Sequence, residues 1–105
     1  MKPDINNSLV KKNWGFEYLF FRNENVAIWH LFIKSEEETS FHCHSKKSTG
    51  LIVVDGVAKI SFLNNSFTKK SLDKVQIFPR RFHKTQSISK DGTTLLEVES
   101  PEDKF

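Results

Sequence analysis

Three histidines have the residue type and spacing of a metal site. His42 and His44 are separated by one residue, and His83 follows a proline-containing loop later in the chain. Side chains on a strand alternate between its faces, so a strand over this region would point His42 and His44 the same way. A third imidazole from a facing strand would complete the triad. The prediction is one divalent metal ion, namely zinc, nickel, manganese or iron, held by His42, His44 and His83.

Two further residues could bind a metal by their type but are not predicted to be ligands. Cys43 should point to the opposite face from His42 and His44, and we expect a small buried residue there. His30 lies within the apolar run Val26–Ile33, where a hydrogen-bonded sheet histidine is more common than a fourth ligand. The metal prediction therefore rests on three imidazoles.

The elements that must position the histidines are short strands. Apolar runs alternate with turn signals such as Asn23-Glu24-Asn25, Asp55-Gly56, Asn64-Asn65 and Asp91-Gly92, and no segment has a helical period. The predicted strands are 16–21, 26–33, 39–44, 50–54, 57–63, 66–69, 74–78, 83–88 and 94–99. Asp55-Gly56 is a strong hairpin signal between two of them. Antiparallel strands this short must close or sandwich to hide their edges, which predicts an all-β jelly-roll barrel.

Length and composition limit the class of protein. The chain has 105 residues, enough for one domain with a modest core, which we divide into an N-terminal arm (1–13) and a barrel (14–105). The net charge of +3 is scattered, which favours a solvated surface over a nucleic-acid interface. No apolar run is long enough to span a bilayer, so no membrane partner is expected. The start of the chain lacks an apolar signal-peptide core and Cys43 is the single cysteine, so we expect the cytoplasm.

Phenylalanine is unusually common, with ten copies. These rings either fill the core of this chain or lie on a sheet face that a second subunit buries. Both alternatives stay open at this point, and a homodimer is the expected assembly.

The surroundings of the histidines resemble the cupin superfamily. In the first cupin motif, His-x-His is followed by a glutamate and then a glycine. Here Gly56 stands at that glycine, while Thr49 stands at the glutamate and Glu36 at the glycine that precedes the histidines. The resemblance implies a cupin jelly roll with three histidine ligands and no carboxylate from position 49.

The second cupin motif is matched more loosely. His83 stands at the motif histidine, with Phe78 at the proline (Pro79 is beside it), Arg80 at the glycine and Ser87 at the asparagine. The segment Asn13-Trp14-Gly15-Phe16-Glu17 and the Ile-x-Pro before His83 are similar to small cupins of the mannose-6-phosphate isomerase-like kind, which are associated with surface polysaccharides. This resemblance implies a carbohydrate ligand, either a sugar or a sugar phosphate.

The implied chemistry is an isomerase-like or epimerase-like proton transfer. Such a reaction needs a base near the carbon and an electrophile on the carbonyl oxygen. Glu97, Glu99 or a metal-bound hydroxide could be the base, although an outward polar face of the last strand is the more common explanation of the two glutamates. Arg80 and Arg81 are expected to grip a phosphate, and Thr49 is the third expected substrate contact. Two alternatives remain, a non-catalytic sugar-binding or regulatory module and a three-histidine iron dioxygenase.

Overall fold

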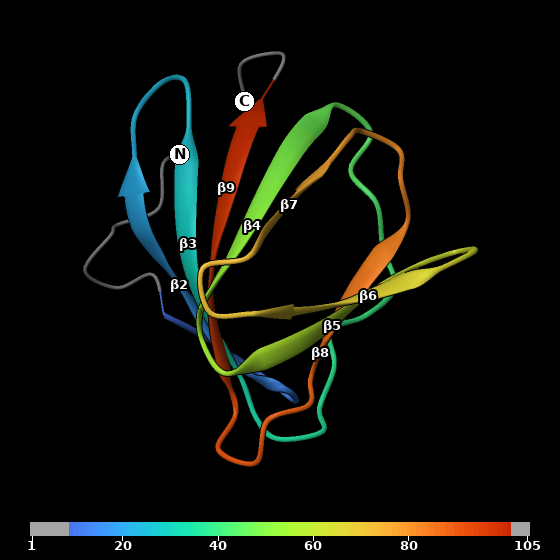
Figure 1. Ribbon diagram of the computed structural model, residues 1–105. Coiled ribbons are helices and arrows are strands. Elements are labelled where there is room, and N and C mark those ends of the chain that lie inside the picture. Colours follow the sequence, from blue (N-terminus) through green and yellow to red (C-terminus); the bar gives the residue numbers. More distant parts are fainter. Residues whose placement is uncertain (1–8, 102–105) are drawn as a thin grey trace.

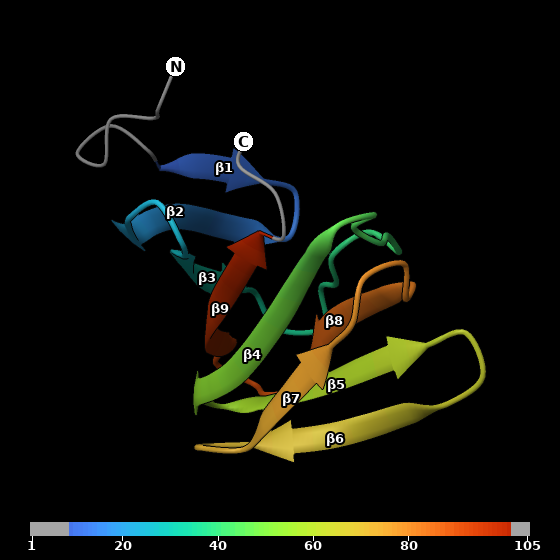
Figure 2. The same ribbon diagram turned by 90° about the horizontal axis from the view of Figure 1, so that it is seen from above.

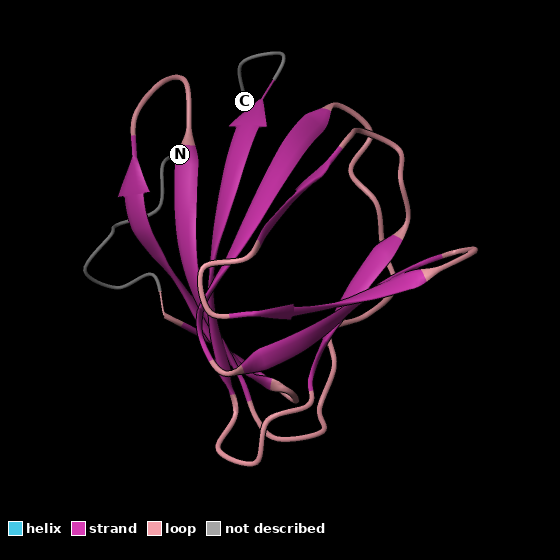
Figure 3. Cartoon of the chain, in the orientation of Figure 1, coloured by secondary structure: helices cyan, strands magenta, loops and turns pink. Residues whose placement is uncertain are grey.

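The chain folds into two antiparallel sheets that pack face to face. The computed structural model describes residues 9–101, and these residues form nine strands joined by turns and loops, as Figures 1 and 3 show. The strands are β1 (Val10–Lys12), β2 (Gly15–Arg22), β3 (Ala27–Ile33), β4 (Lys47–Asp55), β5 (Val57–Phe62), β6 (Ser66–Lys70), β7 (Lys74–Ile77), β8 (His83–Ser87) and β9 (Thr93–Pro101). Residues 9–101 contain no helix long and apolar enough to cross a membrane.

The order of the strands is that of a jelly roll. One sheet has the order β1-β2-β3-β9-β4-β7 and the other has the order β6-β5-β8. All neighbouring strands are antiparallel. Figure 2 shows the three-stranded sheet as a separate layer alongside β4 and β7. The predicted all-β, single-domain barrel of antiparallel strands is therefore confirmed.

The turn at Asp55-Gly56 joins the two sheets. Its flanking strands do not pair with each other, because β5 pairs with β6 and β8 while β4 pairs with β7 and β9. The predicted hairpin is thus wrong, and the segment is a corner. Gly56 has a φ of +93°, and a Cβ there would lie 2.6 Å from the carbonyl oxygen of Gly92. Only glycine fits this close crossing of two corners.

The segment predicted as a strand over 39–44 is not a regular strand. It runs antiparallel beside β8 and pairs with it through isolated bridges, one of which joins His42 to His83. The backbone amide of Thr39 donates to the carbonyl of Thr85 at 2.9 Å. The extended path preserves the alternation of side chains even though the hydrogen-bond ladder is incomplete.

The N-terminal part of the chain is partly within the sheet. Val10–Lys12 fall inside the predicted arm, yet they form β1 and pair with the start of β2. Residues 1–8, the remainder of that arm, lie outside the described residues. The turn after β2 forms as predicted, with the side-chain oxygen of Asn23 accepting hydrogen bonds from the amides of Asn25 and Val26.

The core between the sheets consists mainly of aliphatic side chains. One cluster contains Ile33, Val53, Ala58 and Leu95, with Trp14 packed against it, and a second contains Leu51, Ile60, Phe62 and Ile77. Most phenylalanines contribute little to this core. Those with more than two-fifths of their surface exposed are Phe20, Phe21, Phe41, Phe67, Phe78 and Phe82. The rings therefore lie largely on the surface, and their burial by a second subunit stays a prediction.

Candidate metal centre and ligand cavity

The three predicted histidines meet in space. The ring centroids of His42 and His83 are 4.5 Å apart, those of His42 and His44 are 5.2 Å apart, and those of His44 and His83 are 6.1 Å apart. One ring nitrogen from each residue lies within 4.8 Å of the other two. The triad thus converges from two segments that are distant in the sequence.

Backbone hydrogen bonds hold these segments in register. The amide of His42 donates to the carbonyl of His83 at 3.0 Å, and the amide of His83 donates to the carbonyl of His42 at 2.8 Å. Paired residues in an antiparallel bridge present their side chains on the same face. A third bond, from the amide of Arg80 to the carbonyl of His44 at 2.6 Å, fixes the far end of the segment. The loop before β8 therefore positions all three rings.

The hydrogen bonds of the imidazole rings determine which ring nitrogen can bind a metal ion. Nδ1 of His42 lies 2.8 Å from the carbonyl oxygen of Ser40, and Nδ1 of His83 lies 3.1 Å from that of Arg81. A carbonyl can only accept, so each Nδ1 carries the proton and each Nε2 presents a lone pair. Such bonds on the nitrogen away from the ion are typical of metal-binding histidines.

Burial keeps two of the rings neutral. Desolvation lowers the pKa of His44, although the nearby carboxylate of Glu99 partly opposes this effect. Desolvation also lowers the pKa of His83, which is 2% exposed, against the opposing effect of its hydrogen bond to the Arg81 carbonyl. Neutral imidazole is the form that binds a metal ion.

The donor set fits a divalent metal. Nε2 of His44 is buried and has no hydrogen-bond partner, which is costly for a polar atom unless something else binds it. A metal ion bound by three neutral Nε2 atoms would satisfy this atom. The predicted metal site is supported in this form, while the identity of the metal is not fixed by the geometry.

The histidines form part of the wall of a cavity of about 370 Å³ between the sheets. Three carboxylates also line it, from Glu17 on β2 and from Glu97 and Glu99 on β9. The indoles of Trp14 and Trp29 add flat apolar surface. The cavity thus combines a candidate metal centre with acceptor oxygens and aromatic faces.

Glu97 has an unusual acidity within this cavity. Burial, assisted by the negative charges of Glu99 and Glu17, raises its pKa to about 8, while Lys47 opposes the shift. The carboxyl group is therefore largely protonated at neutral pH. Of the two interpretations of Glu97 and Glu99 left open by the sequence, the structure supports the inward one, because both residues line the cavity.

Arg80 and Arg81 adjoin the histidines through their backbones but do not line the histidine cavity. They line a separate hollow of about 240 Å³ with Phe62 and Phe82. The guanidinium carbon of Arg81 lies 3.6 Å from the ring centroid of Phe62, and Arg80 has a φ of 66°, which turns the chain sharply. The side chains of the two arginines thus line a different hollow from the three histidines, and their contact with a ligand stays a prediction.

Thr49 is the third residue that was expected to contact a ligand. It is 1% exposed on β4 and does not line the histidine cavity. Its partners across the sheet are Ile77 on β7 and Glu99 on β9. Thr49 is buried next to the cavity without lining it, so its contact with a ligand stays a prediction.

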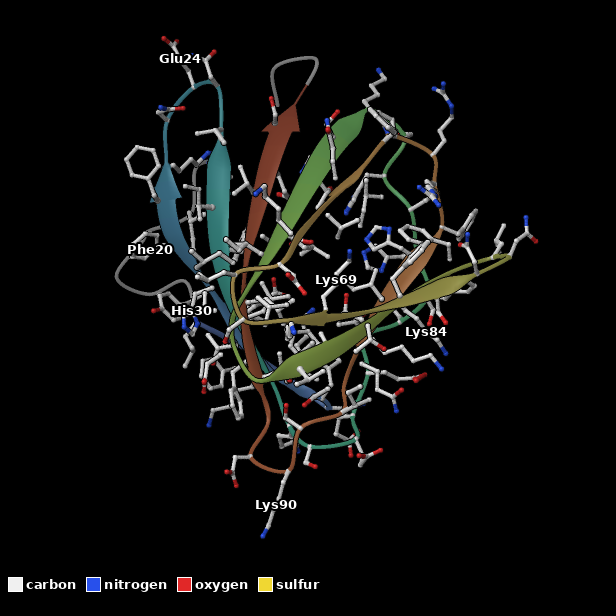
Figure 4. All side chains as sticks on the ribbon, in the orientation of Figure 1. Phe20, Glu24, His30, Lys69, Lys84 and Lys90 are labelled. Carbon is white, nitrogen blue, oxygen red and sulfur yellow. The ribbon has the colours of Figure 1, made fainter. Side chains whose placement is uncertain are left out.

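His30 and Cys43, the two residues of ligand type that were not predicted to bind the metal, do not join the histidine triad. His30 stacks on Tyr18 at 4.8 Å between ring centroids, and Figure 4 places it at the β2–β3 side of the barrel. It is a sheet histidine as expected, although its Nδ1 is buried without a hydrogen-bond partner. Cys43 is half-buried and belongs to neither group of candidate ligands found among residues 9–101.

Several cavity residues received no site role from the sequence. Trp14 and Glu17 entered the prediction only as part of the Asn13–Glu17 segment. No role in a site was predicted for Trp29 or Lys47, although both line the cavity. The signal was available in part, since Glu17 lies in an otherwise apolar and aromatic run. A charged residue at an inward position of such a strand is a candidate for function.

Comparisons with known proteins agree with this architecture. No family model matches the sequence, and no curated protein matches it. Solved structures do match. KdgF from Halomonas sp. superposes with a TM-score of 0.77 at 10% identity, over 96% of this chain and 87% of that one. An RmlC-like cupin from Shewanella frigidimarina gives 0.74 at 18% identity, over 93% and 80%.

A third similar structure belongs to a much longer protein. The capsular polysaccharide assembling protein CapF from Staphylococcus aureus superposes with a TM-score of 0.80 at 16% identity, over 88% of this chain but only 28% of that one. At these identities the likeness establishes the fold. The chain has the cupin fold, and its histidine triad is arranged as a candidate metal centre.

Proposed function

We propose that this protein binds a divalent metal ion through His42, His44 and His83 and uses the adjoining cavity to bind a carbohydrate. The observation that carries the proposal is that the free Nε2 side of the histidine triad faces a cavity lined by both carboxylates and indoles. When bound, the metal would act as a Lewis acid toward ligand oxygens. The remaining recognition belongs to the chain itself.

The lining of the cavity favours a neutral, hydroxyl-rich ligand. Carboxylates accept hydrogen bonds from hydroxyl groups, and the flat faces of Trp14 and Trp29 offer apolar surface for a sugar ring. The Nζ atoms of Lys12 and Lys47 lie 3.6 Å from oxygens of Glu17 and Glu99, so these lysines are already committed to acidic partners. Because Arg80 and Arg81 do not line the cavity, a free sugar suits it better than a sugar phosphate.

A catalytic role in isomerisation or epimerisation is a second candidate. Glu97 favours it, because a carboxyl group with a pKa of about 8 can both give and accept a proton near neutral pH. Glu97 would hold the proton and exchange it with a carbon or oxygen of the bound sugar. The similarity in fold to a capsular polysaccharide assembling protein agrees with a role in surface-polysaccharide metabolism.

The proposal is tested by two successive titrations. Metal-free protein is first titrated calorimetrically with zinc, nickel, manganese and anaerobic ferrous iron. The metal-loaded protein is then titrated with neutral monosaccharides, their phosphates and sugar acids. We expect one metal site and binding of a neutral sugar, with Trp29→Leu weakening the sugar at least tenfold and leaving the metal affinity unchanged.

The matched control is Arg81→Ala, which should change neither titration. Failure of every metal to bind would overturn the proposal. Metal binding with no affinity for any carbohydrate, or oxygen uptake by the iron form, would replace the sugar function with a different one.

A further inference from the structure

Because residue 49 on β4 is a threonine, it offers the candidate metal centre no carboxylate. A carboxylate lies directly across the sheet from it. Thr49 on β4 is in register with Glu99 on β9. Residues directly opposite in an antiparallel pair point to the same face, with their Cβ atoms about 5 Å apart. Glu99 therefore approaches the interior from a position one strand away from that of Thr49.

The carboxylate of Glu99 is within reach of His44, the residue that the two groups of candidate ligands share. Its Oε2 lies 3.9 Å from Nε2 of His44. Donor atoms that bind one ion at about 2.1 Å lie roughly 3 to 3.5 Å from one another, so only a small adjustment is needed for both atoms to bind the same ion. His44 is also shared by the two groups of candidate ligands, one with His42 and His83 and one with Glu97 and Glu99.

The burial of Glu99 needs an explanation. The residue is 7% exposed, and a buried carboxylate is costly unless it is paired or coordinates a metal. Lys47 lies 3.6 Å from its other oxygen, Oε1, but the lysine side chain is one-third exposed. The lysine thus pairs with Oε1 from the solvent side, while Oε2 is directed to the buried nitrogen of His44.

We propose that Glu99 is the fourth protein ligand of the metal, so that the carboxylate of the site comes from the last strand instead of from β4. This inference rests on the proposed metal function. The resulting set of three imidazoles and one carboxylate is harder and more negative than three imidazoles alone. It would favour oxygen-preferring ions such as manganese and ferrous iron more than the triad alone does.

The test compares isosteric variants by metal affinity and by spectroscopy. Glu99→Gln keeps the shape, removes the negative charge and leaves a neutral amide oxygen, which is a weaker ligand than a carboxylate. We expect at least a tenfold loss of affinity for manganese and a changed visible spectrum of the cobalt-substituted protein. Glu24→Gln, which makes the same chemical change at an exposed position in the turn after β2, is the matched control and should retain both the affinity and the spectrum.

Lys47→Met separates coordination from ion pairing. If Glu99 binds the metal, removal of the competing lysine should raise the manganese affinity, opposite in sign to Glu99→Gln. Two results would overturn the inference: a wild-type affinity and cobalt spectrum in Glu99→Gln, or an equal fall in affinity in Glu99→Gln and Lys47→Met. If the wild-type protein binds no metal, the proposed function fails instead, so the two failures are distinguishable. Circular dichroism of each variant confirms that it is folded.

Discussion

The two ends of the barrel interior are built from the same strands and differ sharply in polarity. On β9, the buried side chain of Leu95 near one end is followed along the inward face by Glu97 and Glu99. On β4, Val53 and Leu51 give way to Thr49 and then Lys47. One end is an aliphatic cluster, and the other holds imidazoles, carboxylates and a cavity.

This difference separates stability from function. Burial of apolar surface stabilises the fold by about 25 cal/mol per Å², so the aliphatic end accounts for much of the folding free energy. The polar end buries Glu99 and leaves Nε2 of His44 without a partner, both of which cost stability. Unfavourable groups gathered in one cavity are typical of a functional site.

The largest effect on stability is expected at the aliphatic end. Leu95 is fully buried, so Leu95→Ala removes buried methyl groups and leaves a void. We expect a loss of about 2 to 5 kcal/mol in the free energy of unfolding, measured by urea denaturation. The folded fraction should bind metal with wild-type affinity. A large change in metal affinity would show that the two ends are not independent.

The polar end should show the opposite pattern. His42 is only half-buried, so His42→Ala should change the stability of the metal-free protein by less than about 1 kcal/mol. The same change removes one of three ligands and should lower the metal affinity at least 100-fold, or about 2.7 kcal/mol. Competition with a chromogenic chelator measures this affinity, and an unchanged value would contradict the assignment of His42.

The acidity of Glu97 makes the polar end dependent on pH. Its pKa is raised from 4.5 to about 8 in the folded protein, so its contribution to stability is fully present below pH 4.5 and is lost as the pH rises through 8. Relative to Glu97→Gln, the metal-free wild type should lose about 3 to 4 kcal/mol between pH 5 and pH 8. Urea titrations at several pH values in the presence of a chelator measure the difference. Parallel profiles for the two proteins would refute the shift.

The smallest effect is expected outside the cavity. Arg81→Ala removes the stacking of a guanidinium on Phe62, which is worth about 0.5 to 1 kcal/mol at an exposed site. Thermal denaturation should detect this loss, while metal and sugar binding stay as in the wild type. Weaker binding of sugar phosphates by this variant would restore Arg81 as a ligand-binding residue.

The positions of the histidines could be predicted because alternation survives without a regular strand. The bridge between His42 and His83 keeps the segment extended, so residues two apart still share a face. The corner at Gly56 could not be told from a hairpin by its sequence. An Asp-Gly turn does not reveal whether the two flanking strands, β4 and β5, pair with each other.

Site roles that were predicted only because a residue lies near a histidine in the sequence were less reliable. Arg80 adopts a left-handed backbone conformation and Arg81 stacks on Phe62, and both line a hollow other than the histidine cavity. The inward direction of Glu97 and Glu99 depends on the register of β9 between β3 and β4, which no local pattern specifies. Long-range pairing therefore decides which polar residues join the site.

The most direct test of the account is the metal stoichiometry of the polar end. Metal-free wild-type protein and a variant with His42, His44 and His83 all changed to Ala are each incubated with manganese or zinc and analysed by native mass spectrometry and elemental analysis. The account predicts one bound ion per wild-type chain and none per variant chain, with both proteins folded. Equal metal content in the two proteins, or none in the wild type, would contradict it.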